Sequence, residues 1–191
     1  MSDEIPSEIH NCYKQAYQCI TSNESIRHLL NALSSSGCPF DFDRHLVCES
    51  TNENIRGGFD RSTCQIVLNP KNLYSSQELC TILEHELIHA YDYCRVHIDF
   101  NNPYHLACTE IRAAALTNQC SLFNHISSSS RPYLLKNQHS VCVKNQTRES
   151  MEICTNLSRK NLDEIINDVF LRCYNDTEPL DGIGRRRRRR Q

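Results

Sequence analysis

Apolar residues recur three or four positions apart through the first part of the chain. Cys12, Ala16 and Cys19 form one such series, and the stretch Ile26–Leu33 repeats the spacing. This periodicity places apolar side chains on one face of an α-helix. Residues 34–39 read Ser-Ser-Ser-Gly-Cys-Pro, a composition that interrupts helices. The pattern therefore predicts helical structure up to about Leu33.

A strand is predicted next, at Thr63–Leu68, because this segment is rich in β-branched residues. The pair Gly57 and Gly58 precedes it and is interpreted as a turn. A long helix then follows over Ser76–Val96, with Ser75 or Ser76 positioned to cap its first turn.

Three more helices are predicted after this one. The first runs from about Tyr104 to Phe123, behind an Asn-Asn-Pro break. Two shorter amphipathic helices are expected near Arg148–Leu157 and Lys160–Tyr174, and Pro179–Gln191 is interpreted as a flexible tail. These elements predict a mainly helical α+β fold with a small sheet. We divide it into an N-terminal helical segment (1–33), a main domain (34–180) and a basic tail (181–191).

Charge is distributed unevenly along the chain. Six of the 21 basic residues are Arg185–Arg190, which leaves 15 basic against 23 acidic residues elsewhere. An acidic body argues against a broad nucleic-acid-binding face, and no nucleic-acid partner is expected. The tail is interpreted as a solvated end, with contact to anionic lipid or a nuclear address as alternatives. No apolar run approaches the roughly twenty residues of a membrane span.

Twelve cysteines are spread along almost the whole sequence, with no C-x-x-C pair. The absence of that pair argues against zinc fingers and thioredoxin-type sites. An even number at wide spacing favours a framework of up to six disulfides, formed in an oxidising compartment. The alternative is a set of reduced, buried thiols. The polar, acidic residues 1–10 resemble neither a secretory signal nor an Arg-rich presequence.

Residues 85–89 read His-Glu-Leu-Ile-His, the pattern H-E-x-x-H, within the predicted long helix. Residues four apart lie on one face of a helix, so His85 and His89 can bind one Zn²⁺ through their ring nitrogens. Glu86 lies to the side, where a carboxylate can reach the water on the metal. Both histidines are expected outside the main apolar stripe of the helix, as in a cleft. The alternative is a solvated pair of surface histidines.

A catalytic zinc site requires a third protein ligand and an open position. We predict Glu110, on the next helix, as that ligand, with His97 and His105 as alternatives. Asp92 is better placed to orient a ligand histidine. Glu110 has a second interpretation, as a surface carboxylate paired with Arg112.

The predicted chemistry is hydrolysis of a peptide bond. Zinc lowers the pKa of its bound water to about 7, and Glu86 accepts the proton and then delivers it to the leaving amine. Tyr93, His97, His105 and Arg112 are candidate donors to the oxyanion. An extended substrate could pair with the strand Thr63–Leu68.

Five segments occur in this order along the chain: Arg-Gly-Gly-Phe-Asp at 56–60, His-Glu-Leu-Ile-His-Ala-Tyr-Asp at 85–92, Cys-Arg at 94–95, His-Leu-Ala-Cys-Thr-Glu-Ile-Arg-Ala-Ala at 105–114 and Cys-Tyr-Asn-Asp-Thr-Glu-Pro at 173–179. Together they closely resemble the mitochondrial inner-membrane metalloprotease family that processes and helps assemble the ATP synthase, whose vertebrate members are also called Ku-binding protein. The resemblance covers roughly residues 38–180.

The resemblance implies a zincin-like zinc endopeptidase of the intermembrane space, attached peripherally to the inner membrane. Its protein substrate would be an ATP synthase subunit precursor. By position, His85 and His89 would bind zinc and Glu86 would be the catalytic residue, and the cysteines would be oxidised on import. Ser127–Arg131 and the arginine tail match no motif of the family. Two alternatives remain, a non-proteolytic assembly factor and a nuclear DNA-repair partner.

Overall fold

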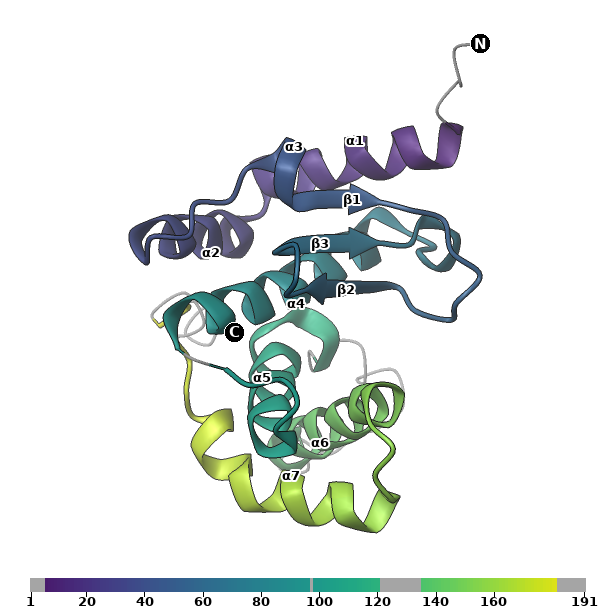
Figure 1. Ribbon diagram of the computed structural model, residues 1–191. Helices are drawn as coiled ribbons and strands as arrows, with labels where there is room; N and C mark the ends of the chain where they lie inside the picture. The colour runs from purple at the N-terminus through teal and green to yellow at the C-terminus, as the bar shows by residue number, and fades with distance from the viewer. Residues whose placement is uncertain (1–5, 97, 121–134, 182–191) are drawn as a thin grey trace. The chain divides into compact units, whose positions relative to one another are not determined.

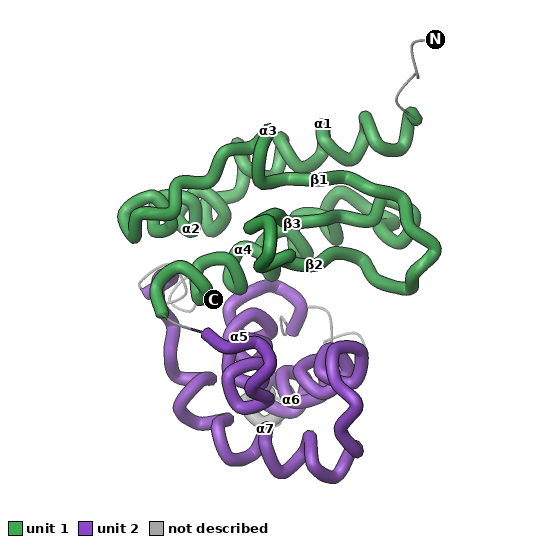
Figure 2. The backbone as a smooth tube through the Cα atoms, viewed as in Figure 1, with its two compact units in different colours: residues 1–96, 182–191 green, residues 97–181 purple. Residues whose placement is uncertain are grey.

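A computed structural model describes residues 6–96, 98–120 and 135–181 of the chain, without the side chains of 135–137. It divides into two compact units, shown in Figure 2. Unit 1 contains residues 1–96 and 182–191, and unit 2 contains residues 97–181.

Unit 1 begins with two helices, α1 (Ser7–Ser22) and α2 (Glu24–Ser35). Asn23 separates them, because its side-chain oxygen accepts hydrogen bonds from the backbone N–H groups of Ser25 and Ile26 and so caps α2. The predicted helical segment is therefore confirmed, but as two helices. The apolar series of the sequence are buried, with Ala16 and Leu29 both 0% exposed.

A short helix, α3 (Phe42–His45), leads into a sheet of three strands: β1 (Leu46–Cys48), β2 (Gly57–Asp60) and β3 (Gln65–Leu68). The strand order is β1-β3-β2, as Figure 1 shows. β3 pairs parallel to β1 and antiparallel to β2. The strand predicted at Thr63–Leu68 is confirmed for its last four residues. Cys64 lies in the preceding turn, with a positive φ of 55°.

The central position of β3 makes one sequence-based prediction wrong. A substrate cannot pair with β3, because both of its edges already bind neighbouring strands. The sequence could not reveal this, since a strand's place in a sheet depends on partners that are distant along the chain.

The turn predicted at Gly57 and Gly58 is also wrong, because both residues lie in β2 and pair with β3. The need for glycine at 57 comes from packing. A Cβ there would lie 2.7 Å from Ile82 Cγ2 and 3.1 Å from the Val67 carbonyl oxygen. At Gly58, in contrast, a Cβ would meet no atom within 4 Å.

These neighbouring glycines provide a matched pair of variants. We expect Gly57→Ala to lower the free energy of unfolding by about 1–3 kcal/mol, since Ile82 must move. Gly58→Ala is expected to be neutral or to stabilise by up to about 1 kcal/mol, because alanine restricts the unfolded chain. Urea unfolding of both variants measures the difference. Equal effects would contradict the proximity of Gly57 to Ile82.

The long predicted helix is confirmed as α4 (Ser76–Arg95), which follows the short 3₁₀ helix η1 (Pro70–Asn72). Ser75 caps α4, because its Oγ accepts a hydrogen bond of 3.1 Å from the backbone N–H of Glu78. The Glu78 carboxylate in turn accepts one of 3.0 Å from the N–H of Tyr74. These two bonds fix the start of the helix.

Disulfides join elements within each unit and confirm the oxidised framework expected from the cysteine pattern. All twelve cysteines lie in the described residues, and five disulfides link ten of them. Unit 1 contains Cys12–Cys48, Cys19–Cys80 and Cys38–Cys94, and unit 2 contains Cys108–Cys173 and Cys120–Cys142. In unit 1 two disulfides hold α4. Cys80, near the start of α4, is joined to α1, and Cys94, near the end of α4, is joined to the segment after α2.

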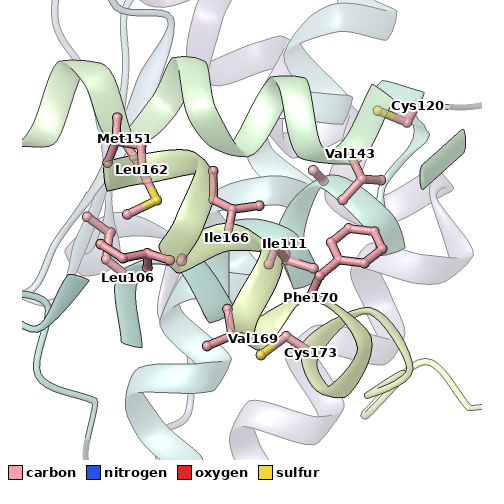
Figure 3. Packing of buried hydrophobic residues seen from close by; sticks show 13 residues of the cluster. Leu106, Ile111, Cys120, Val143, Met151, Leu162, Ile166, Val169, Phe170 and Cys173 are labelled. Carbon is pink, nitrogen blue, oxygen red and sulfur yellow. The ribbon is translucent and has the colours of Figure 1, made fainter. Parts of the chain in front are cut away.

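Unit 2 is helical: α5 (Pro103–Leu116), the 3₁₀ helix η2 (Asn118–Cys120), α6 (Leu135–Cys154) and α7 (Arg159–Tyr174). Thirteen buried residues from these elements form its core, in which Ile111, Ile166 and Phe170 pack together (Figure 3). α5 ends earlier than predicted, and the predicted end at Phe123 lies outside the described residues.

α6 is twice as long as the ten residues predicted at Arg148–Leu157, and it also ends three residues earlier. Its buried stripe is narrow, with Val143, Thr147 and Met151 all 0% exposed at four-residue spacing. One buried side chain per turn is a weak amphipathic signal, which explains the short prediction. α7 confirms the predicted helix at Lys160–Tyr174.

The segment after α7 is anchored rather than flexible up to Asp181. Arg112 of α5, which is 1% exposed, donates to the backbone carbonyl oxygens of Asp176 and Glu178 and pairs with the Asp176 carboxylate. Leu180 is 7% exposed. The tail prediction is thus wrong for Pro179–Asp181. Arg185–Arg190 and Ser127–Arg131 lie outside the described residues.

Candidate metal centre

His85, Glu86 and His89 lie in the middle of α4, where the helix is buried almost all round. The three side chains are 9%, 6% and 5% exposed. Burial of both imidazoles contradicts the alternative of a solvated surface pair. Histidine and glutamate in such a place need polar partners or an ion, because unpaired burial of these groups is costly.

The two imidazoles converge within unit 1. Their Nε2 atoms are 3.0 Å apart, and the ring planes are inclined at 80°. Two nitrogens at about 2.0–2.1 Å from one tetrahedral ion would be roughly 3.3 Å apart, which is close to this separation. The i, i+4 spacing on a straight helix brings the rings together, so both nitrogens could bind one metal ion.

Further along α4, the Asp92 carboxylate is 1% exposed and accepts a hydrogen bond of 3.0 Å from Arg95 Nε. The Arg95 guanidinium also lies 5.4 Å from the centre of the Tyr91 ring. These contacts order the last turns of the helix. The predicted role of Asp92 in orienting a ligand histidine stays a prediction.

β2 lies beside the His85–His89 stretch of α4. Gly57 lies against Ile82 at one end, and the Phe59 ring is 5.7 Å from the Tyr93 ring at the other. His85, Glu86 and His89 fall between these two contact points along the helix. Tyr93 is 39% exposed, and its role as an oxyanion donor stays a prediction.

In unit 2, Glu110 is 5% exposed on α5, among the buried residues Thr109, Ala113 and Ala114. Its interpretation as a surface carboxylate is wrong, because Glu110 is buried. Arg112 binds the segment after α7. Arg112 was one of four candidate oxyanion donors, and that role stays a prediction.

The other two candidates for the third ligand differ from Glu110. His105 is exposed, and its Nδ1 accepts a hydrogen bond of 3.2 Å from the backbone N–H of Asp99. His97 lies outside the described residues. Among the candidates that the structure describes, Glu110 is therefore the buried one.

Comparison with known proteins identifies the family. The model of the peptidase M76 family matches residues 10–181 of the chain. The chain belongs to the peptidase M76 family. The M76 family consists of metallopeptidases, so the chain is a metallopeptidase, and the family resemblance noted in the sequence is confirmed.

Three relatives illustrate the breadth of this M76 group. The human mitochondrial inner membrane protease ATP23 homolog is 40% identical over 173 residues, covering 90% of this chain and 70% of the human protein. Its Xenopus laevis counterpart is 37% identical over 184 residues, covering 96% and 77%. Mitochondrial inner membrane protease ATP23 of the yeast Meyerozyma guilliermondii is 26% identical over 182 residues, covering 95% and 74%.

No solved structure matches the chain significantly. In the described part of this M76 protein, no helix has the length and apolar character required to span a membrane.

Proposed function

We propose that this chain is a zinc-dependent endopeptidase with a zincin-like catalytic domain within residues 34–180. The observation that carries the proposal is the convergence of two buried imidazoles, His85 and His89, beside a buried Glu86 on one helix. Membership of a metallopeptidase family supports it.

Zinc is the proposed metal because of the donor chemistry. Two imidazoles and one carboxylate are a donor set found in catalytic zinc sites, and nitrogen ligands suit zinc better than magnesium or calcium. We assign Glu110 as the third ligand, on the strength of its burial and its chemistry. A bound zinc ion would supply Lewis-acid activation of water and of the scissile carbonyl group.

Glu86 would hold and move the proton. Its carboxylate would accept a proton from the attacking water and pass it to the leaving amine. Because the side chain is only 6% exposed, competing bulk water is largely excluded from it. The substrate would lie along β2, which is the edge strand beside α4, and not along the central β3.

The proposed setting is the intermembrane-space side of the mitochondrial inner membrane, with peripheral attachment. There the chain would process an ATP synthase subunit precursor and assist assembly of the enzyme. The names of the relatives support a location at the mitochondrial inner membrane. The five disulfides favour an oxidising compartment over the nucleus. The substrate can be tested in cells depleted of the chain, where we expect an uncleaved ATP synthase subunit to accumulate.

Metal analysis tests the site directly. We expect the full-length chain to bind one zinc ion, and His85→Ala and His89→Ala to lose it. Glu110→Ala should weaken zinc binding by more than the roughly 10–100-fold typical of losing an outer-shell partner. Zinc content by mass spectrometry and competition with a fluorescent chelator measure these effects.

His105→Ala is the matched control, because His105 is exposed and was the alternative ligand. It should bind zinc as the wild type does. Full zinc content in His85→Ala would overturn the site. Unchanged affinity in Glu110→Ala, with loss in His105→Ala, would instead assign the third position to His105.

A further inference from the structure

A groove runs along β2 within unit 1. Its volume is about 260 Å³ and its lining is almost entirely apolar. It is bounded by the whole of β2, by Val67 and Asn69 around the end of β3, and by Thr51 and Ile55 from the loop between β1 and β2. The proton transfer proposed above does not use it.

The groove opens on the side of the sheet that faces away from α4. Gly57 pairs with Leu68, and both face α4, since a Cβ on Gly57 would touch Ile82. Successive residues of a strand point to opposite faces. Gly58 and its partner Val67 therefore point the other way, toward the groove.

The loop that forms one wall is held firmly by two asparagines. Asn69 is 2% exposed, and its Nδ2 donates to the carbonyl oxygens of Thr51, Glu53 and Ile55 at 3.1–3.3 Å. Asn72 Nδ2 donates to the last two of these at 2.8 Å each. A wall fixed in this way loses little conformational entropy when a ligand binds.

The charged residue of the lining, Asp60, is turned toward its own hairpin. Its carboxylate accepts hydrogen bonds from the Ser62 N–H at 2.8 Å, the Ser62 hydroxyl at 2.6 Å and the Thr63 hydroxyl at 2.8 Å. These bonds, led by that of the Ser62 hydroxyl, lower the pKa of Asp60 below its usual value. The groove therefore offers an apolar surface to a ligand.

We propose that this groove is a subsite for an apolar side chain of a protein substrate that lies extended along β2. An extended segment can add to an edge strand through main-chain hydrogen bonds, while alternate side chains enter pockets beside the strand. β2 is such an edge strand, and on its other face Gly57 and Phe59 contact α4 on either side of the His85–His89 stretch. Successive side chains of a substrate on this edge would therefore point alternately toward α4 and toward the groove. The inference rests on the proposed peptidase function and adds a preference for a class of side chain.

Gly58 provides a selective way to fill the groove. It lines the groove, and a Cβ there meets nothing within 4 Å, so a larger side chain fits without displacing the fold. Leucine is also better suited to a strand than glycine. Gly58→Leu should therefore fold normally and occupy the space of the substrate side chain. Val47→Ile, on the same face of β1 but outside the groove, is the matched control.

The probes are short quenched-fluorescent peptides that differ at one position at a time, with Leu, Ala or Asp. For the zinc-loaded wild type we expect one position where Leu is cleaved with roughly 10–100-fold higher kcat/KM than Asp. Gly58→Leu should abolish the preference for Leu at that position, so that the Leu peptide loses more of its kcat/KM than the Ala peptide does. Val47→Ile should retain the preference. Equal losses for the Leu and Ala peptides, or an unchanged preference, would overturn the subsite.

Binding separates this inference from the peptidase function. Peptides of the same sequences, labelled with a fluorophore and no quencher, can be titrated by fluorescence polarisation into full-length zinc-loaded Glu86→Gln, with and without Gly58→Leu. If the Leu peptide binds more tightly than the others, and this difference is lost on adding Gly58→Leu, the subsite is supported. That conclusion holds even if the wild type cleaves no peptide, because the lack of cleavage would overturn only the proposed peptidase function. Cleavage together with binding that is indifferent to Gly58→Leu would overturn only the subsite.

Discussion

Replacing Glu86 with glutamine is expected to reduce peptide cleavage by about 10²–10⁴-fold, because the amide cannot accept the proton of the attacking water. Glutamine has nearly the same shape as glutamate, so the fold and the bound zinc should be retained. The measurement is cleavage of a quenched-fluorescent peptide by the zinc-loaded full chain, with zinc content and melting temperature recorded for the same samples.

Glu78→Gln provides the control, since it makes the same chemical change near the start of the same helix. The Glu78 carboxylate accepts a hydrogen bond from the Tyr74 N–H and pairs with Arg56 at 3.2 Å, so this variant should lose a little stability and keep its cleavage rate. Full activity in Glu86→Gln would show that Glu86 does not carry out the proposed proton transfer. In cells, normal ATP synthase assembly with Glu86→Gln would show that an assembly role does not need cleavage.

Removal of Arg112 is expected to have the largest effect on stability. Its guanidinium is 1% exposed and holds Asp176 and Glu178 against α5. In Arg112→Ala these two carbonyl groups lose their donor and the Asp176 carboxylate loses its partner. Breaking a buried pair in this way costs about 3–5 kcal/mol. Because Asp176 is one-third exposed, we expect the lower end, or a melting temperature reduced by roughly 6–12 °C.

Arg172→Ala removes the same side chain from an exposed position on α7 and should change the free energy of unfolding by at most about 0.5 kcal/mol. Limited proteolysis adds a local readout, because residues 175–181 should become cleavable in Arg112→Ala. A melting temperature and a proteolysis pattern like those of the wild type would show that this anchor contributes little.

Features that depend on neighbours along the chain were predictable. The start of α4 followed from Ser75 and Glu78, and the helical periodicity of α7 followed from its apolar stripe. The length of α6 was underestimated for a physical reason. The helix buries one side chain per turn, at Val143, Thr147 and Met151, and Thr147 is a polar residue although it is fully buried. Periodicity detects a broad apolar face much better than a narrow one.

The glycines of β2 show the opposite limit. Gly57 and Gly58 have the local signature of a turn, yet they pair with β3 as a strand. The reason is the approach of Ile82, which leaves no space for a side chain at Gly57. Arg112 is similar, because it binds two carbonyl groups that lie more than sixty residues away, and no local pattern indicates such partners.

The sequence by itself placed His85, Glu86 and His89 on one helix and indicated an oxidised cysteine framework, because i, i+4 spacing and cysteine number are local or compositional properties. Only the tertiary structure decided the disulfide partners, the central place of β3 and the anchoring of the segment after α7. Each of these depends on which distant residues pack together, and packing is a property of the folded chain as a whole.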